Sequence, residues 1–275
     1  MKFVFASDLH GDHFLYKELK KLVEQESNIN LLLLGGDLFA HTRDLQSQIS
    51  FVNGYFKDFV EEINTKIFFI PGNIDWPSAI DAINQLPPQS GIRQLDIEGV
   101  AINRNTLIVG YPNVTPSPLH RKDYERRDLD SDSISPVADS HITDKKGKTI
   151  SIDQEYFTER HSIQQDLEQI SKESNIWVTH VPPYGGMLDV TYKKIHAGSK
   201  ALRNKITELQ PILTLHGHIH EAPEVTGMWF EKIGNTISIN PGMEKNQLHA
   251  VVGEIDESGV IQSMHHTIFG EFKEF

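Results

Sequence analysis

The strongest constraint on the fold is a series of short apolar runs separated by segments of helical periodicity. The first 75 residues contain three such runs, at 2–6, 30–34 and 66–70, and apolar residues recur at helical spacing between them. A continuous apolar run of this length is typical of a strand that is buried on both faces of a parallel sheet. We therefore expect strand, helix, strand, helix and strand in this order, which is the pattern of a layered α/β protein.

The remaining periodic segments predict further helices and strands. Helices are expected at about 78–86, over Ile163 to Ile170, and after Ser199, which can cap a helix that buries Leu202 and Ile206. Strands are expected at 100–102, 106–110, 176–179, 212–215, 228–233, 236–239, 248–255 and 260–266. The last four are divided by turn residues, so we expect them to pair as hairpins.

From Tyr111 to about Arg160 the periodicity is lost. Charged residues crowd together at 121–128 and four prolines lie between 112 and 136, so this stretch is not expected to be part of the core. Loops this long inside compact domains usually either carry function or are disordered. We expect a single domain over 1–275 with an insertion at about 111–160, which is either a lid over the functional site or a solvated surface excursion.

Composition excludes several classes of function. Cysteine is absent, which rules out thiolate metal ligands and cysteine nucleophiles, suits a cytoplasmic protein, and leaves nitrogen and oxygen atoms to bind any metal. No apolar stretch approaches the about 20 residues of a membrane span. The net charge of -12 argues against a nucleic-acid or anionic-membrane binder. It does not exclude a phosphate substrate, because a metal centre can dominate the local field.

Five of the predicted strands are followed at once by side chains that can bind metals or protons. The carboxyl ends of strands in an open α/β sheet form the crevice where ligands bind, so these side chains are expected to converge. Each pattern alone is ordinary in a surface loop, and it is their joint occurrence that indicates a site. The residues are Asp8 and His10, Asp37, Asn73 and Asp75, His180, and His218 and His220 within the cluster His216-Gly217-His218-Ile219-His220.

This set of motifs closely resembles that of the calcineurin-like metallophosphoesterases, in particular the small stand-alone prokaryotic branch. The family pattern D-x-H, G-D, G-N-[HD], H and G-H-x-H stands here as Asp8-Leu9-His10, Gly36-Asp37, Gly72-Asn73-Ile74-Asp75, His180 and Gly217-His218-Ile219-His220. The resemblance implies an α/β/β/α fold with central sheets between helices. It also implies that one metal binds Asp8, His10, Asp37 and His220. The second metal would bind Asp37, Asn73, His180 and His218, with Asp37 as the bridge.

The function implied is hydrolysis of a small phosphomonoester or phosphodiester by a hydroxide that bridges two divalent ions. Manganese is favoured over iron, zinc and cobalt, and the catalytic residues would be Asp37, Asn73, Asp75 and His180. With two dications, two carboxylates and one hydroxide, the centre keeps about one unit of positive charge, which suits a phosphate oxyanion. The alternative is an inactive scaffold of the same family that binds a protein partner.

The roles of neighbouring residues stay open. His216 either orients a ligand or packs, and Asp75 holds either a ligand or the fold. Ile74 stands where many members of the family carry the histidine that protonates the leaving group. His13, His41 and His196 are candidate replacements, unless the leaving group needs no acid. Of the other candidates, Asp12 can cap the first helix, Arg43 and Lys200 can bind phosphate, and Phe269, Phe272 and Phe275 either pack on their own domain or form a homo-oligomer contact.

Overall fold

The three N-terminal strands lie side by side in a seven-stranded sheet of the computed structural model, which describes residues 1–42, 44–144 and 146–272. The strand order is β15-β14-β13-β1-β2-β3-β4. Strands β1 to β4 are parallel to one another, and β13 pairs antiparallel with β1. The bounds are β1 Lys2–Ala6, β2 Leu31–Leu34, β3 Lys66–Phe69, β4 Ile92–Gln94, β13 Val251–Ile255, β14 Ile261–His266 and β15 Gly270–Glu271.

A second sheet of six strands faces the first, with the order β11-β12-β10-β9-β6-β5. Strand β10 lies between β9 and β12 and is parallel to both. The hairpins predicted near the C-terminus are confirmed, because β11 pairs antiparallel with β12 and β13 with β14. The bounds are β5 Val100–Asn103, β6 Thr106–Tyr111, β9 Ile176–Thr179, β10 Leu213–Leu215, β11 Phe230–Ile233 and β12 Thr236–Ile239.

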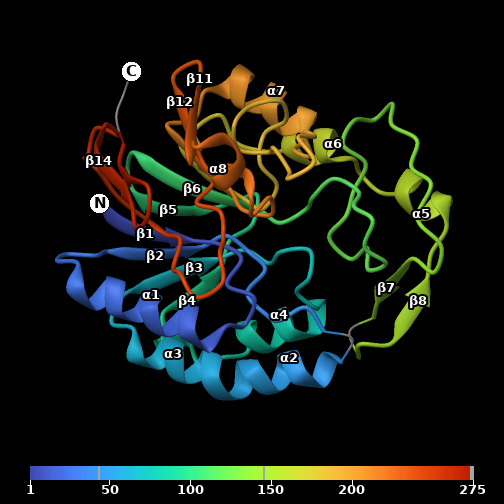
Figure 1. The fold of residues 1–275 in the computed structure, drawn as a ribbon, viewed down its shortest axis with the longest axis horizontal. Coiled ribbons are helices and arrows are strands. Elements are labelled where there is room, and N and C mark those ends of the chain that lie inside the picture. Colours follow the sequence, from blue (N-terminus) through green and yellow to red (C-terminus); the bar gives the residue numbers. More distant parts are fainter. Residues whose placement is uncertain (43, 145, 273–275) are drawn as a thin grey trace.

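Helices cover the outer face of each sheet, which gives the predicted α/β/β/α layers (Figure 1). Alternate residues of β1 show how the layers form. Phe3 and Phe5 pack between the two sheets, whereas Val4 and Ala6 pack under the helices of the first layer. The helices are α1 His13–Gln25, α2 Leu45–Phe51, α3 Lys57–Glu62, α4 Pro77–Asn84, α5 Gln154–Thr158, α6 Ile163–Leu167, α7 Lys200–Leu209 and α8 Ala222–Thr226.

Local signals in the sequence explain where several helices begin. Asp12 caps α1 by accepting hydrogen bonds from the first-turn amides, and Ser199 caps α7 in the same way. The second predicted helix is interrupted between α2 and α3 by a π-helical segment, Val52–Phe56, which keeps the predicted apolar side against the core. A 3₁₀ turn, Pro88–Ser90, precedes β4. None of the helices in the described part of the chain is both long and apolar enough to cross a membrane.

The stretch from 111 to 160 lies to one side of the layers and contains α5 and a small hairpin, β7 His141–Thr143 with β8 Thr149–Ser151 (Figure 1). The expectation that this stretch lies outside the core is wrong for its charged run. Lys122 and Glu125 form an ion pair at 2.7 Å, with side chains only 1% and 0% exposed. Asp128 accepts hydrogen bonds at the start of α7. These charges can be buried because they pair with one another or with backbone groups.

Candidate metal centre

The loops that follow five strands bring the predicted ligands together. Asp8, Asp37 and Asn73 follow β1, β2 and β3, which are adjacent and parallel. His180 and the His218 loop follow β9 and β10, which are likewise adjacent and parallel in the other sheet. The carboxyl ends of both sets of strands therefore meet in one place.

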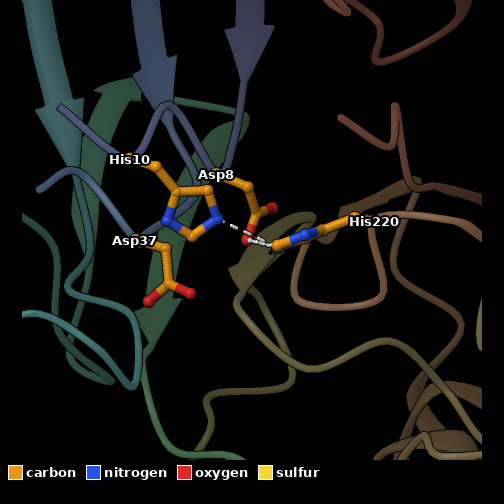
Figure 2. A group of neighbouring side chains, drawn as sticks. All are labelled: Asp8, His10, Asp37 and His220. Carbon is orange, nitrogen blue, oxygen red and sulfur yellow. Dashed lines mark hydrogen bonds and ion pairs between the residues drawn. The ribbon is translucent and has the colours of Figure 1, made fainter. Parts of the chain in front are cut away.

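Four of these side chains form a tight cluster, shown in Figure 2. The ligand atoms of Asp8, His10, Asp37 and His220 all lie within 4.8 Å of one another. The Nε2 atom of His220 is 3.1 Å from both His10 Nε2 and Asp8 Oδ1. Two imidazoles and two carboxylates are a ligand set that suits manganese, iron, zinc or cobalt. This cluster contains all four residues assigned to the first metal by resemblance.

The residues assigned to the second metal lie on the other side of Asp37. His180 Nε2 is 3.4 Å from Asp37 Oδ2 and 3.3 Å from Asn73 Oδ1. The opposite ring nitrogen of His180 is 2.8 Å from the Gly35 carbonyl oxygen, which fixes the ring with Nε2 towards Asp37. The His218 ring lies against that of His180, with 5.2 Å between centroids. Asp37 thus contacts both groups, as a bridging ligand would.

The backbone at the site adopts conformations that L-residues rarely occupy. Asp8, His10, Asp37 and His218 have φ angles of 59°, 48°, 50° and 66°. Each such residue costs on the order of 1 kcal/mol and is retained only where its surroundings hold it in place. Strain of this kind collects at functional sites. Four of the seven predicted ligands therefore share a local signature that is independent of their side chains.

Two glycines let the strand-end loops approach one another closely. A Cβ atom on Gly72 would lie 2.1 Å from Asp37 Oδ1, and one on Gly217 would lie 2.3 Å from Asp8 Oδ2. Neither distance is possible for a real side chain, so any larger residue would displace a predicted ligand. The glycines of the Gly72-Asn73 and Gly217-His218 motifs are explained by this close approach.

The electrostatics of the site keep its carboxylates ionised. Burial alone would raise the pKa of Asp8, but the interactions with His220 and His180 together outweigh burial and lower the pKa to about 2. Burial would also raise the pKa of Asp37, but His180, His10 and the Ile74 amide together outweigh burial and lower it. In turn, burial would lower the pKa of His180, but Asp37, Asp8 and the Gly35 carbonyl together raise it to about 9. The negative charge of the carboxylates is thus partly balanced by protonated imidazole. A bound cation would take the place of these protons.

Asp75 was predicted as a catalytic residue, and its contacts favour a different role. Its carboxylate accepts hydrogen bonds from the backbone amides of Gly72, Leu38 and Phe39, at 2.8, 3.2 and 3.0 Å. It therefore ties the loop after β3 to the loop after β2. Burial and the nearby charge of Asp37 raise the pKa of Asp75 to about 7. These contacts correspond to the second of the roles expected for Asp75, which is to hold the fold in place.

His216 packs away from the cluster. Its two ring nitrogens each lie 2.8 Å from a threonine hydroxyl, of Thr179 on β9 and Thr214 on β10. Burial lowers its pKa to about 3, so the ring is neutral. Of the three neighbouring histidines, His216 thus links two strands, whereas His218 and His220 face the site.

The other histidine and lysine candidates differ in whether they lie near the centre. His13 stacks on Tyr55, with centroids 3.9 Å apart, and His196 contacts Asp189 at 2.7 Å, so each already has a close partner. His41 lines a pocket beside the centre. Lys200 lies over the ring of Tyr184.

The aromatic side chains near the C-terminus pack on their own domain. Phe272 packs on Phe230 and Phe269 on His266, with centroids 4.6 Å and 4.9 Å apart. Arg43 and Phe275 lie outside the described residues.

Two pockets adjoin the centre and share Asn73, Ile74, His41 and Leu119. The first, of about 540 Å³, is lined by His10, Asp37, His218 and His220 among others. The second, of about 600 Å³, is lined on one side by the insertion. Sequence reasoning missed its residues Trp76, His120, Arg121 and His141. For His120, Arg121 and His141 the only signal was the loss of periodicity after Tyr111, and no signal indicated Trp76.

Comparison with known proteins agrees with this geometry. The family model described as calcineurin-like phosphoesterase matches residues 1–222. Among solved structures, TT1561 of Thermus thermophilus is 14% identical with a TM-score of 0.55, over 96% of this chain and 98% of that one. A dimetal phosphatase from Danio rerio is 12% identical with a TM-score of 0.56, over 98% and 96%. A search of curated proteins found no match. The match over most of its length places the chain in the calcineurin-like phosphoesterase family.

Proposed function

We propose that this protein is a phosphoesterase that binds two divalent cations, manganese foremost, and hydrolyses phosphomonoesters or phosphodiesters without a covalent enzyme intermediate. The observation that carries the proposal is the cluster of Asp8, His10, Asp37 and His220, with ligand atoms within 4.8 Å of one another. Bound cations would supply an activated water molecule and offset the negative charge of the phosphate. The dimetal phosphatase from Danio rerio, which shares the fold, is a precedent for two cations in such a scaffold.

The two histidines of the cluster are placed in a way that suits a bound cation. The Nε2 atoms of His10 and His220 lie 3.1 Å apart, and the other ring nitrogen of His10 is buried without a hydrogen-bond partner in the described structure. Two imidazoles that face each other at this distance compete for a single proton, whereas a cation between them and the carboxylates would accept both lone pairs. Burial lowers the pKa of His10, which keeps the ring in the neutral form that binds metals.

Each side chain has a distinct task in this proposal. Asp37 joins the two groups of ligands, and His180 is oriented by the Gly35 carbonyl. Asp8 is held by the backbone amide of His218, at 3.2 and 3.1 Å from its two oxygens. The substrate phosphate would enter the pocket of about 540 Å³, whose lining also includes Lys245.

The test is hydrolysis of 4-nitrophenyl phosphate and bis(4-nitrophenyl) phosphate by protein that has been stripped with a chelator and reloaded with manganese, iron, zinc or cobalt. Asp37→Asn should lower kcat/KM at least about a thousandfold, since it removes the charge shared by both groups. Asp58→Asn, at an exposed position on α3, is the matched control and should retain activity. Absence of activity with every metal and both substrates would favour the alternative, an inactive scaffold that binds a protein partner.

A further inference from the structure

The pocket of about 600 Å³ beside the metal centre has a lining that the proposed hydrolysis does not use. We call it the insertion pocket, because residues 119–121, 139, 141 and 149 of its lining belong to the stretch between 111 and 160. It meets the candidate centre at Asn73 and Ile74, which line both pockets. A substrate whose phosphate lies at the centre would therefore extend its leaving group into the insertion pocket.

Arg121 gives this pocket a permanent positive charge. The residue is 9% exposed, its guanidinium donates a hydrogen bond to the Ile74 carbonyl, and its Cζ atom lies 4.9 Å from the centroid of the Trp76 ring. Within the described residues, no carboxylate lies at ion-pair distance from it. The carboxylates of Asp123, Asp75 and Asp37 act on it only from beyond that distance, so an anion in the pocket would add the close counter-ion that the buried guanidinium lacks.

Three imidazoles add hydrogen-bonding capacity to the same lining. His120 Nδ1 is 3.0 Å from the Ala138 carbonyl oxygen, and His141 Nδ1 is 3.1 Å from the carbonyl oxygen of Asp139. The Nε2 atoms of both rings have no hydrogen-bond partner in the part of the chain that the structure describes. His41 is the third imidazole. Against these groups and Arg121, the lining contains one carboxylate, that of Asp139.

Other side chains of the lining give the insertion pocket an apolar surface. Ile74, Trp76 and Leu119 contribute apolar surface. The indole N–H of Trp76 is buried and has no hydrogen-bond partner in the described structure. The volume of the pocket is within the range of sites that bind small molecules. The pocket thus combines apolar side chains with a guanidinium and imidazoles, a pattern that fits a short organic group that carries an anion.

We propose that the insertion pocket selects phosphate esters whose leaving group carries a second anion, either a carboxylate or a further phosphate. This proposal rests on the proposed function, because it takes the first phosphate to lie at the metal centre. His120, His141 and Arg121 are then specificity residues, and the insertion is the element that sets which substrate is accepted.

Phosphonates test this proposal without any need for turnover. We would measure the affinity of manganese-loaded protein for propylphosphonate, 3-phosphonopropionate and ethane-1,2-bisphosphonate by isothermal titration calorimetry. The three ligands share one phosphonate and differ only in a neutral, carboxylate or phosphonate end. The two ligands with a second anionic end should bind about tenfold tighter than propylphosphonate, as expected for one charge-assisted hydrogen bond. Whichever of the two binds more tightly identifies the anion.

Variants of the lining should remove this preference. His120→Gln with His141→Gln changes two side chains that are exposed or half-exposed, so the fold should persist. The variant should bind all three ligands within about twofold of one another, with propylphosphonate unaffected. His161→Gln, at an exposed histidine outside both pockets, is the matched control and should keep the tenfold preference. Arg121→Met is the second variant and should have the same effect as the double substitution.

Several results would overturn the proposal. Equal affinities of the wild-type protein for the three ligands would show that the pocket has no preference for a second anion. If Arg121→Met weakened all three ligands alike, Arg121 would serve the phosphate at the centre instead. The proposed hydrolysis fails separately, on the nitrophenyl substrates, because phosphonates are not turned over in either case.

Discussion

Replacement of Gly72 by alanine should separate the geometry of the metal centre from the stability of the fold. Gly72 follows β3 and lies against the loop that carries Asp37. A Cβ atom at this position would lie 2.1 Å from Asp37 Oδ1 and 2.2 Å from Asp37 N, whereas ordinary contacts of a Cβ atom begin at 3.4 Å. The two loops must therefore part by about 1 Å, which moves the carboxylate that contacts both groups of ligands.

The expected magnitude follows from this displacement. A shift of about 1 Å in a catalytic group lowers activity about a hundredfold, and the overpacking costs about 1–3 kcal/mol of unfolding free energy. Gly54→Ala is the matched control, because a Cβ atom there would meet nothing within 4 Å. That control should keep full activity and, since Gly54 lies within a helical segment, should gain up to about 1 kcal/mol.

The assay has three parts: kcat/KM on 4-nitrophenyl phosphate with manganese, the manganese Kd from calorimetry, and urea unfolding. The Gly72→Ala variant should lose activity and manganese affinity while it unfolds cooperatively at a slightly lower urea concentration. Activity and manganese affinity within twofold of wild type, in a folded variant, would refute the role given to Asp37. Loss of the fold itself would refute the argument that the strain stays local.

Three further predictions concern the insertion, acid stability and the leaving group. Glu125→Gln leaves Lys122 buried without its partner and should lower the free energy of urea unfolding by about 3–5 kcal/mol. Glu62→Gln, which removes one side of an exposed ion pair, should lower it by under about 1 kcal/mol. Equal losses in the two variants would contradict the role of burial. Burial lowers the pKa of His266 from 6.5 to about 4. Metal-free protein should therefore lose up to about 3 kcal/mol of unfolding free energy as the pH falls from 6.5 to 4. If a His266→Gln variant lost the same free energy over this pH range, His266 would be excluded as the cause. Ile74→His should accelerate hydrolysis of alkyl phosphates more than of nitrophenyl phosphates, and equal effects on both would show that a missing proton donor does not limit the rate.

The sign of the pH effect follows from the hydrogen bonds of His266. Its Nδ1 atom accepts from the backbone amides of Ile268 and Phe269, at 2.9 and 3.2 Å, and its Nε2 atom lies 2.9 Å from the Pro241 carbonyl oxygen. The folded protein therefore requires the neutral ring. The unfolded chain takes up a proton below pH 6.5, so stability is complete above that value and falls below it.

The parts of the fold that were predictable from sequence are those determined by local pattern. Alternation and apolar runs identify the strands, and the few residues that follow each strand identify Asp8, Asp37, Asn73 and His180, because strand ends in parallel sheets meet at one edge. The cap at Asp12 was predictable for the same reason, since its partners lie within three residues.

The parts that were not predictable depend on contacts between distant segments. The charged run at 121–128 has the composition of a solvated loop, yet Lys122 and Glu125 are buried because they pair with each other inside the insertion. His216 shares its sequence context with His218 and His220, and only the pairing of β9 with β10 shows that its nitrogens bind threonine hydroxyls. No local pattern indicates that Gln48 bonds to backbone groups on both sides of Asp75.

The backbone of Ile74 explains why a substitution of its side chain is informative. The Ile74 amide donates to Asp37 Oδ1 at 3.0 Å, and its carbonyl accepts from Gln48 and from Arg121. The main-chain atoms of Ile74 thus link a carboxylate of the metal centre to a side chain that lines the insertion pocket. A histidine at position 74 keeps all of these hydrogen bonds, because none of them involves the isoleucine side chain. Any change in the preference between alkyl and nitrophenyl leaving groups would therefore report on the new imidazole, and not on a displaced Asp37.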